Sequence, residues 1–279
     1  MRRWPRLVRI AALGLIGFCV AAPVLALDNA EAAARQRATR AKAIPKGPQC
    51  PQAGAHTASF ARVVSGTSFL TTDGAEIRLA GVLAPGEDGQ PAAATEGARA
   101  RLSGRLASET LTYAADEAAR DRYGRVPAQV FVGGQWLQGD MLRAGELRSA
   151  PDSASGACAT LLLAAEDQAR MERTGSWRTG TFALRTPEQI ANRAGTFQIV
   201  EGTVQTATVN KGRAYINFGD DYRDDFTVTV APEDMKLFRQ ARFDVRKLAG
   251  KRVRVRGWVE LYHGPEMEIA SPAAIETLP

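Results

Sequence analysis

Hydrophobic and polar positions alternate along residues 61–86, and this period of two predicts strands rather than helices. Apolar residues alternate up to Val64, recur at residues 69–70 and return at residues 77–79. The Thr-Asp-Gly triplet at residues 72–74 separates the second run from the third and is typical of a hairpin turn. The pattern therefore predicts an antiparallel meander of three strands.

The following stretch mixes helical and strand periods. Ala98, Leu102 and Leu106 recur at helical spacing, which predicts a helix over residues 95–108 with one apolar face. The other elements expected in this half are strands over residues 110–114 and 126–132 and helices over residues 138–145 and 157–173.

A second mainly β pattern follows residue 196. We expect a linker over residues 179–196, with a short helix over residues 187–193. Five strands are predicted over residues 197–209, 214–218, 226–230, 252–261 and 267–269, with one helix over residues 232–242. Five strands with a helix between the third and the fourth is the order of an oligonucleotide/oligosaccharide-binding (OB) fold.

Residues 1–26 have the composition of a signal peptide. Four arginines precede an apolar run over residues 10–22, and the Val-Leu-Ala triplet at residues 24–26 is a small-residue cleavage signal. We expect a mature protein that begins at Leu27, is periplasmic or secreted, and keeps no stable membrane anchor; an uncleaved anchor is the alternative. Residues 27–56, which are poor in large apolar side chains, are expected to form a flexible spacer.

The net charge of +6 belongs largely to that leader, because removing its four arginines lowers it to +2. Residues 57–178 carry 13 basic and 15 acidic side chains, so this half is slightly acidic. A protein that captured nucleic acid through its overall field would be more basic. Any anion binding must therefore come from local patches.

Cys50 and Cys158 are the two cysteines that remain after leader removal. An even number of cysteines in an exported chain predicts a disulfide between them, and two buried free thiols are the alternative. The chain has only two histidines, which are too few parts for a Cys/His zinc cluster or a Ser-His-Asp triad.

Two stretches carry a specific resemblance. Residues 61–86 (ARVVSGTSFLTTDGAEIRLAGVLAPG) and residues 121–125 (DRYGR) resemble the staphylococcal nuclease-like (thermonuclease) family, whose members read V-x-D-G-D-T and then I-R-L-x-G-I-D-A-P-E. The resemblance covers about residues 57–178 and implies a five-stranded OB-type barrel with packed helices. The expected fold is therefore mainly β with helices (α+β), with a second small OB-like β-barrel over residues 197–279.

The resemblance also assigns site residues. In that family two aspartates hold a calcium ion, a glutamate assists the attacking water, and two arginines brace the phosphate. Here Thr67 stands at the first aspartate position, Leu83 at the second and Gly86 at the glutamate position, whereas Arg78 and Arg125 match the arginines. Calcium needs six to eight oxygen ligands, so we expect no metal site and no cofactor.

A nuclease-like site without metal or base predicts binding without hydrolysis. We expect a catalytically degenerate binding or scaffold module for nucleic acid, for an oligosaccharide or another anionic polymer, or for an envelope protein. The alternative is an active calcium-dependent phosphodiesterase in which Glu87, Asp73, Glu76 or Asp88 rebuilds the metal site. A structural protein that binds no nucleic acid is the third reading.

The second predicted barrel offers a further candidate surface. Arg252, Arg254, Arg256 and Trp258 share one parity of a predicted strand, and arginine beside an exposed indole suits a phosphate backbone and a stacked base or sugar. A solvated, charged strand face is the alternative. The Asp-rich turn at residues 220–225 suggests calcium, but its spacing fits no EF-hand and we expect a simple turn.

Overall fold

The computed structural model describes residues 49–52, 54–90, 95–107, 110–115, 120–221 and 223–279 of the 279-residue chain. The predicted leader and most of the predicted spacer lie outside these residues. Residues 46–279 form one compact unit, which contains two large hydrophobic cores. We call residues 49–179 the N-terminal part and residues 184–279 the C-terminal part. Along the described stretches, no helix is both long and apolar enough to cross a membrane.

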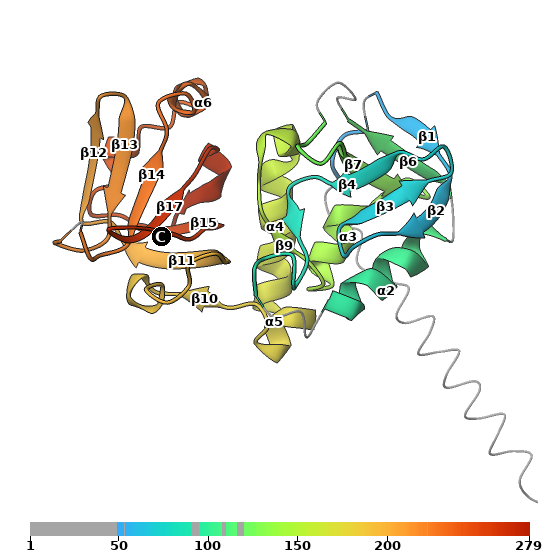
Figure 1. Cartoon of the computed structure of the whole chain (residues 1–279), viewed down its shortest axis with the longest axis horizontal. Coiled ribbons are helices and arrows are strands. Elements are labelled where there is room, and N and C mark those ends of the chain that lie inside the picture. The colour runs from blue at the N-terminus through green and yellow to red at the C-terminus, as the bar shows by residue number, and fades with distance from the viewer. Residues whose placement is uncertain (1–48, 53, 91–94, 108–109, 116–119, 222) are drawn as a thin grey trace, which may run out of the picture. The chain divides into compact units, whose positions relative to one another are not determined.

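A seven-stranded sheet forms the N-terminal part, in the order β1-β6-β7-β4-β3-β2 with β8 paired to β7 (Figure 1). Antiparallel pairing of β2 with β3 and of β3 with β4 confirms the predicted meander. The pairing of β4 with β7 is parallel. The strands are β1 His56–Ala58, β2 Phe60–Val63, β3 Ser68–Thr71, β4 Glu76–Leu79, β6 Leu111–Ala114, β7 Val126–Val132 and β8 Gln135–Trp136, and a separate pair joins β5 Val82–Leu83 to β9 Arg148–Ser149.

Helices pack against this sheet to close the first core. The predicted apolar face of α2 is confirmed, since Ala98, Leu102 and Leu106 are all buried. Helix α3 packs on α4, which buries Leu162 and Ala169. The helices are α2 Thr95–Leu106, α3 Leu137–Arg143, α4 Ala159–Met171 and α5 Gly175–Thr179, with the 3-10 turn η1 Ser153–Cys158 before α4.

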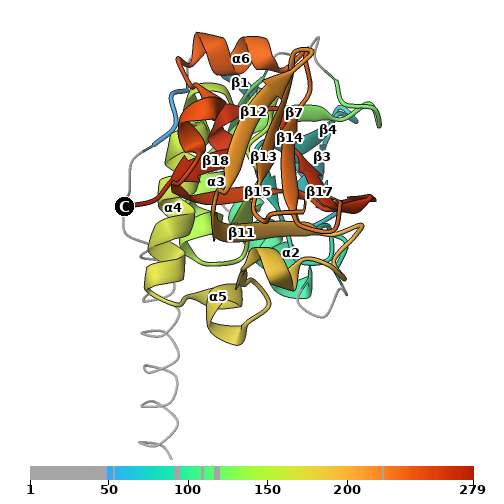
Figure 2. The same ribbon diagram turned by 90° about the vertical axis from the view of Figure 1, so that its left-hand side faces the viewer.

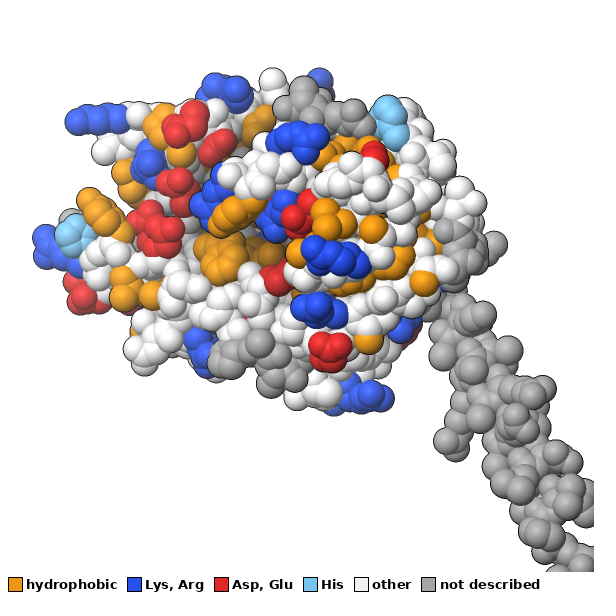
Figure 3. All heavy atoms as spheres, turned by 45° about the vertical axis from the view of Figure 1, so that its right-hand side comes forward, with side chains coloured by type: hydrophobic (Ala, Val, Ile, Leu, Met, Phe, Trp, Pro, Cys, Tyr) orange, Lys and Arg blue, Asp and Glu red, His pale blue; other side chains and the backbone are white. Residues whose placement is uncertain are grey.

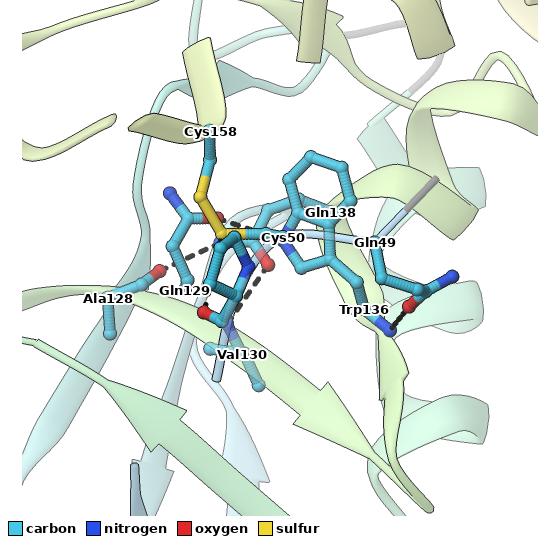
Figure 4. The surroundings of a disulfide bond; sticks show 9 residues. Gln49, Cys50, Ala128, Gln129, Val130, Trp136, Gln138 and Cys158 are labelled. Carbon is cyan, nitrogen blue, oxygen red and sulfur yellow. Dashed lines mark hydrogen bonds between the residues drawn. A yellow bond between two sulfur atoms is a disulfide. The ribbon is translucent and has the colours of Figure 1, made fainter. Parts of the chain in front are cut away.

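A disulfide joins Cys50 to Cys158, as predicted, across 108 residues of sequence with the two Cα atoms 5.3 Å apart. Figure 4 shows the bond beside a buried network of amides and an indole. The Trp136 indole N–H donates to Gln129 Oε1 at 2.9 Å, and the Gln138 amide donates to the Ala128 carbonyl at 2.8 Å. The disulfide thus ties the segment before the first strand to the start of α4.

Two sheets make up the C-terminal part, in the orders β10-β11-β15-β18 and β12-β13-β14-β17-β16. Figure 2 shows β12, β13 and β14 of the second sheet side by side. The elements are β10 Leu184–Arg185, η2 Pro187–Gln189, β11 Phe197–Thr203, β12 Thr206–Asn210, β13 Arg213–Asn217, β14 Thr227–Val230, α6 Met235–Gln240, η3 Val245–Leu248, β15 Arg252–Trp258, β16 Glu260–Tyr262, β17 Gly264–Glu268, η4 Pro272–Ala274 and β18 Ile275–Thr277.

Two predicted strands are each divided in the structure. The run over residues 197–209 passes from β11 to β12, which lie in different sheets, because Val204 is buried and bonds to Lys251 O while Gln205 bonds to Asn217 O. The run over residues 252–261 likewise divides into β15 and β16. The helix expected over residues 187–193 is only the 3-10 turn η2, and β18 was not predicted.

The disulfide gives a stability prediction. Replacing both cysteines (Cys50→Ala with Cys158→Ala) should lower the free energy of unfolding by about 2–4 kcal/mol, because a long loop is no longer constrained in the unfolded chain. The measurement is urea denaturation with and without reductant. The free energies of unfolding of the wild type and the variant should become equal when reductant is present. Equal values without reductant would contradict the prediction.

Candidate anion-binding cleft

A cavity of about 480 Å³ opens on the N-terminal part beside the end of β15. Figure 3 shows hydrophobic side chains with basic and acidic side chains around them on one face of the molecule. The cavity, which we call the cleft, is lined by Ser65, Thr67, Arg78, Leu83, Glu87, Asp121, Arg122, Tyr123, Arg125 and Trp258.

The parallel pairing of β4 with β7 brings the two predicted arginines to this cleft. Ile77 lies opposite Val126 in the register, so Arg78 follows one member of the pair and Arg125 precedes the other. Ile77 is fully buried on the opposite face of its strand, so side-chain alternation directs Arg78 away from the core. Two guanidinium groups from distant sequence positions therefore line one cavity.

Each of these arginines is held by a carboxylate. Arg78 lies 3.3 Å from Asp152, and Arg125 Nε donates to Asp121 at 2.7 Å. Burial alone would raise the pKa of Asp121, but hydrogen bonds from the Arg125 side chain and from the Arg125 and Tyr123 backbone N–H groups lower it. Asp121 therefore stays ionised, and both guanidinium groups are oriented before any ligand arrives.

Tyr123 adds an aromatic surface to the rim of the cleft. Its side chain is 66% exposed, and the guanidinium carbons of Arg122 and Arg125 each lie 4.9 Å from its ring centroid. The exposed ring therefore adds an aromatic surface, already in contact with two guanidinium groups, to the basic rim of the cleft.

Glu87 points into the cleft, as the alternative with a shifted carboxylate requires. Its carboxylate accepts hydrogen bonds from Thr67 Oγ1 at 2.6 Å and from the Thr67 and Ala84 backbone N–H groups at 3.1 and 3.4 Å. Gly86 has a φ of +83°, a conformation that a residue with a side chain adopts with strain, and the carboxylate of this loop comes one residue later, at Glu87. Three donors from the surrounding loops already hold this carboxylate.

The other acidic candidates lie in different settings. Asp88 is 1% exposed and pairs with Arg148 at 2.6 Å, so its charge is already balanced. Asp73 accepts from Thr71 Oγ1 within its turn, and Glu76 accepts from Ser68 Oγ at 2.8 Å. The described residues contain no group of three or more His, Cys, Asp or Glu side chains that could hold a metal ion.

Leu83 belongs to an apolar cluster that spans the two parts of the chain. It packs in one group with Phe197 and Ile199 of β11, and all three side chains are buried. The turn after Leu83 meets the same strand, since Phe197 N donates to Asp88 O at 2.8 Å. Leu83, which the resemblance aligns with the family's second aspartate, is therefore part of a hydrophobic contact with the C-terminal part.

The predicted binding face on β15 is divided by the structure. Arg252 is exposed and Trp258 is 43% exposed, whereas Arg254 and Arg256 are 8% and 1% exposed. Arg254 pairs with Glu201 at 2.7 Å and Arg256 with Glu166 at 2.7 Å. The expectation that all four share one open face is wrong, because carboxylates from other segments cover the central two.

The structure instead unites residues that the sequence assigned to two separate sites. Trp258 lines the cleft together with Arg78 and Arg125. The remaining member of the predicted set, Arg252, does not line the cleft and pairs with Glu201 at 3.1 Å. Sequence reasoning missed Asp152 as the partner of Arg78, and no local pattern identifies a carboxylate so distant in sequence.

Residues 76–179 match the family model described as staphylococcal nuclease homologue. The match includes Arg78, Leu83, Glu87 and Arg125 of the cleft and ends before the C-terminal part begins. No curated protein matches the chain.

The cluster around Leu83 generates a prediction about restoring the aspartate. Leu83→Asp should lower the free energy of unfolding by about 3 kcal/mol or more, because it removes an apolar contact and buries a carboxylate against Phe197 and Ile199. Urea denaturation measures this loss, and Leu83→Met is the control that keeps the volume and should cost less than about 1.5 kcal/mol. A Leu83→Asp variant of unchanged stability that gains calcium affinity by calorimetry would refute the assignment.

Proposed function

Since the chain carries a staphylococcal nuclease-like domain, we propose that the protein binds the phosphate backbone of a nucleic acid in the cleft without hydrolysing it. The observation that carries the proposal is the convergence of Arg78 and Arg125 on one cavity beside Tyr123. Guanidinium groups bind phosphate oxygens through paired N–H donors, and their orientation by Asp152 and Asp121 reduces the side-chain freedom lost on binding.

The oxygen donors of the cleft do not fit the calcium ion that the family implies. Leu83 presents an isobutyl group to the apolar cluster, and the Thr67 hydroxyl donates a hydrogen bond to Glu87. Two carboxylates line the cleft, Glu87 and Asp121, and Asp121 is already paired with Arg125. Calcium takes six to eight oxygen ligands, with carboxylates supplying the negative charge. We therefore derive no hydrolytic step through a metal.

Export is part of the proposal. The signal-peptide composition of residues 1–26 supports a periplasmic or secreted protein. The disulfide between Cys50 and Cys158 supports an oxidising compartment, where such bonds persist. In that setting the ligand is extracellular nucleic acid or another anionic polymer, and an envelope protein remains a candidate partner.

One observation favours a second function, a metal-dependent phosphodiesterase. Glu87 lies in the same cleft as both arginines, which is the position a general base would need. That enzyme would require Glu87 to release its bonds to Thr67 and to recruit a cation. The two functions differ in their response to chelation.

The test is binding and cleavage of a labelled DNA oligonucleotide by the mature protein. We expect binding by fluorescence anisotropy that is insensitive to EDTA, that weakens as salt rises, and that leaves the oligonucleotide intact. Arg78→Ala and Arg125→Ala should each weaken binding about tenfold, since each removes a charge-assisted hydrogen bond. Arg246→Ala, which removes an exposed arginine that does not line the cleft, is the matched control.

Cleavage that stops with EDTA and with Arg125→Ala would overturn the proposal in favour of the phosphodiesterase. Absence of binding at low salt would overturn the proposal in favour of the third hypothesis, a structural protein that binds no nucleic acid.

A further inference from the structure

A second, smaller cavity of about 200 Å³ adjoins the cleft, and Arg78, Leu83 and Trp258 line both. Its volume is below the 300 Å³ or so of ordinary small-molecule pockets, so it suits one ring system rather than a polymer segment. We call it the side pocket. The remaining lining residues are Ala150, Pro151, Asp152, Phe197, Arg256, Gly257, Glu268, Ile269, Ala270 and Ala274.

The walls of the side pocket are mainly apolar and aromatic. Leu83 and Phe197 belong to the buried apolar cluster, and Trp258 meets Phe197 edge to face with ring centroids 6.0 Å apart. Four charged residues complete the lining, and each is already in an ion pair. Arg78 pairs with Asp152, Arg256 with Glu166 and Glu276, and Glu268 with Arg213. A flat heteroaromatic ring with polar edges matches this combination of walls.

Trp258 is held in place by the strand that carries it. It pairs with Phe197 in the register of β11 and β15, and it lies two residues after Arg256. Arg256 is fully buried between Glu166 of α4, at 2.7 Å, and Glu276 of β18. The indole is nevertheless 43% exposed, so it offers an open surface from a fixed position.

Because Arg78 lines both cavities, a ligand with a phosphate in the cleft can extend a neighbouring group into the side pocket. We propose that the side pocket binds an unpaired nucleobase stacked on Trp258, next to the phosphate held by Arg78. The inference rests on the proposed function and narrows its ligand to single-stranded nucleic acid. In a duplex the bases are stacked and paired, so none can enter the pocket without being flipped out.

The C-terminal part then has a defined role in recognition. The nuclease-like domain supplies the guanidinium groups, and β15 supplies the ring on which the base stacks. Neither part alone lines the side pocket, because Leu83 comes from β5 and Trp258 from β15.

The test compares an oligothymidylate with an abasic strand of the same length and with a duplex, using fluorescence anisotropy on the mature full-length protein. We expect the oligothymidylate to bind more tightly than either. Trp258→Ala should weaken oligothymidylate binding about tenfold, the effect of losing one base–aromatic stack, and should weaken binding of the abasic strand much less. Trp258→Phe should restore most of the loss.

Leu261→Ala is the matched control, since Leu261 is 63% exposed on β16, the next strand in sequence, and lines neither cavity. If the oligothymidylate and the abasic strand bind equally tightly, and both depend on Arg78, base binding in the side pocket is overturned. Phosphate binding in the cleft would still be supported. Equal weakening of both strands by Trp258→Ala would also overturn base binding in the side pocket. If no strand binds, the proposed function itself fails.

Discussion

The buried ion pair between Glu166 and Arg256 is the constraint on which the arrangement of the molecule depends. Both side chains are fully buried, and Glu166 also accepts the Ser149 N–H at 2.6 Å. Burial alone would lower the pKa of Arg256, but the carboxylates of Glu166 and Glu276 raise it, so the arginine is charged. A buried charge that loses its partner is strongly destabilising, so α4 and β15 cannot separate without a large penalty.

A second buried ion pair also joins the N-terminal part to the C-terminal part. Arg148 pairs with Asp88 at 2.6 Å and donates to the Phe197 carbonyl at 2.7 Å. Burial lowers the pKa of Arg148 to about 10, with Asp88 and Glu166 opposing the shift, which keeps the guanidinium protonated at neutral pH. The contact extends to the backbone, because a Cβ on Gly89 would come within 2.1 Å of Gly195 O. These interactions set Leu83 against Phe197 and place Trp258 beside Arg78.

The sequence predicts most of what local patterns determine. The alternation over residues 61–86 identified the meander, helical spacing identified the buried face of α2, and the even cysteine count identified the disulfide. It failed on the arginines of β15, because alternating arginines look the same whether water or distant carboxylates face them. The outcome was decided by Glu166 and Glu201, which are remote in sequence. The position of Glu87 depended on the backbone at Gly86, which a motif comparison does not contain.

One composite cleft that uses residues of both parts is proposed to bind nucleic acid without a metal. A titration of isotopically labelled protein with oligothymidylate in EDTA, followed by NMR, tests it most directly. We expect the Trp258 indole signal and the Arg78 and Arg125 side-chain signals to shift along one saturable curve, while the signal of the buried Trp136 indole does not shift. Metal-free binding in the cleft is ruled out if the signals shift only when calcium is added, or if the signals of Trp258 and both arginines do not shift.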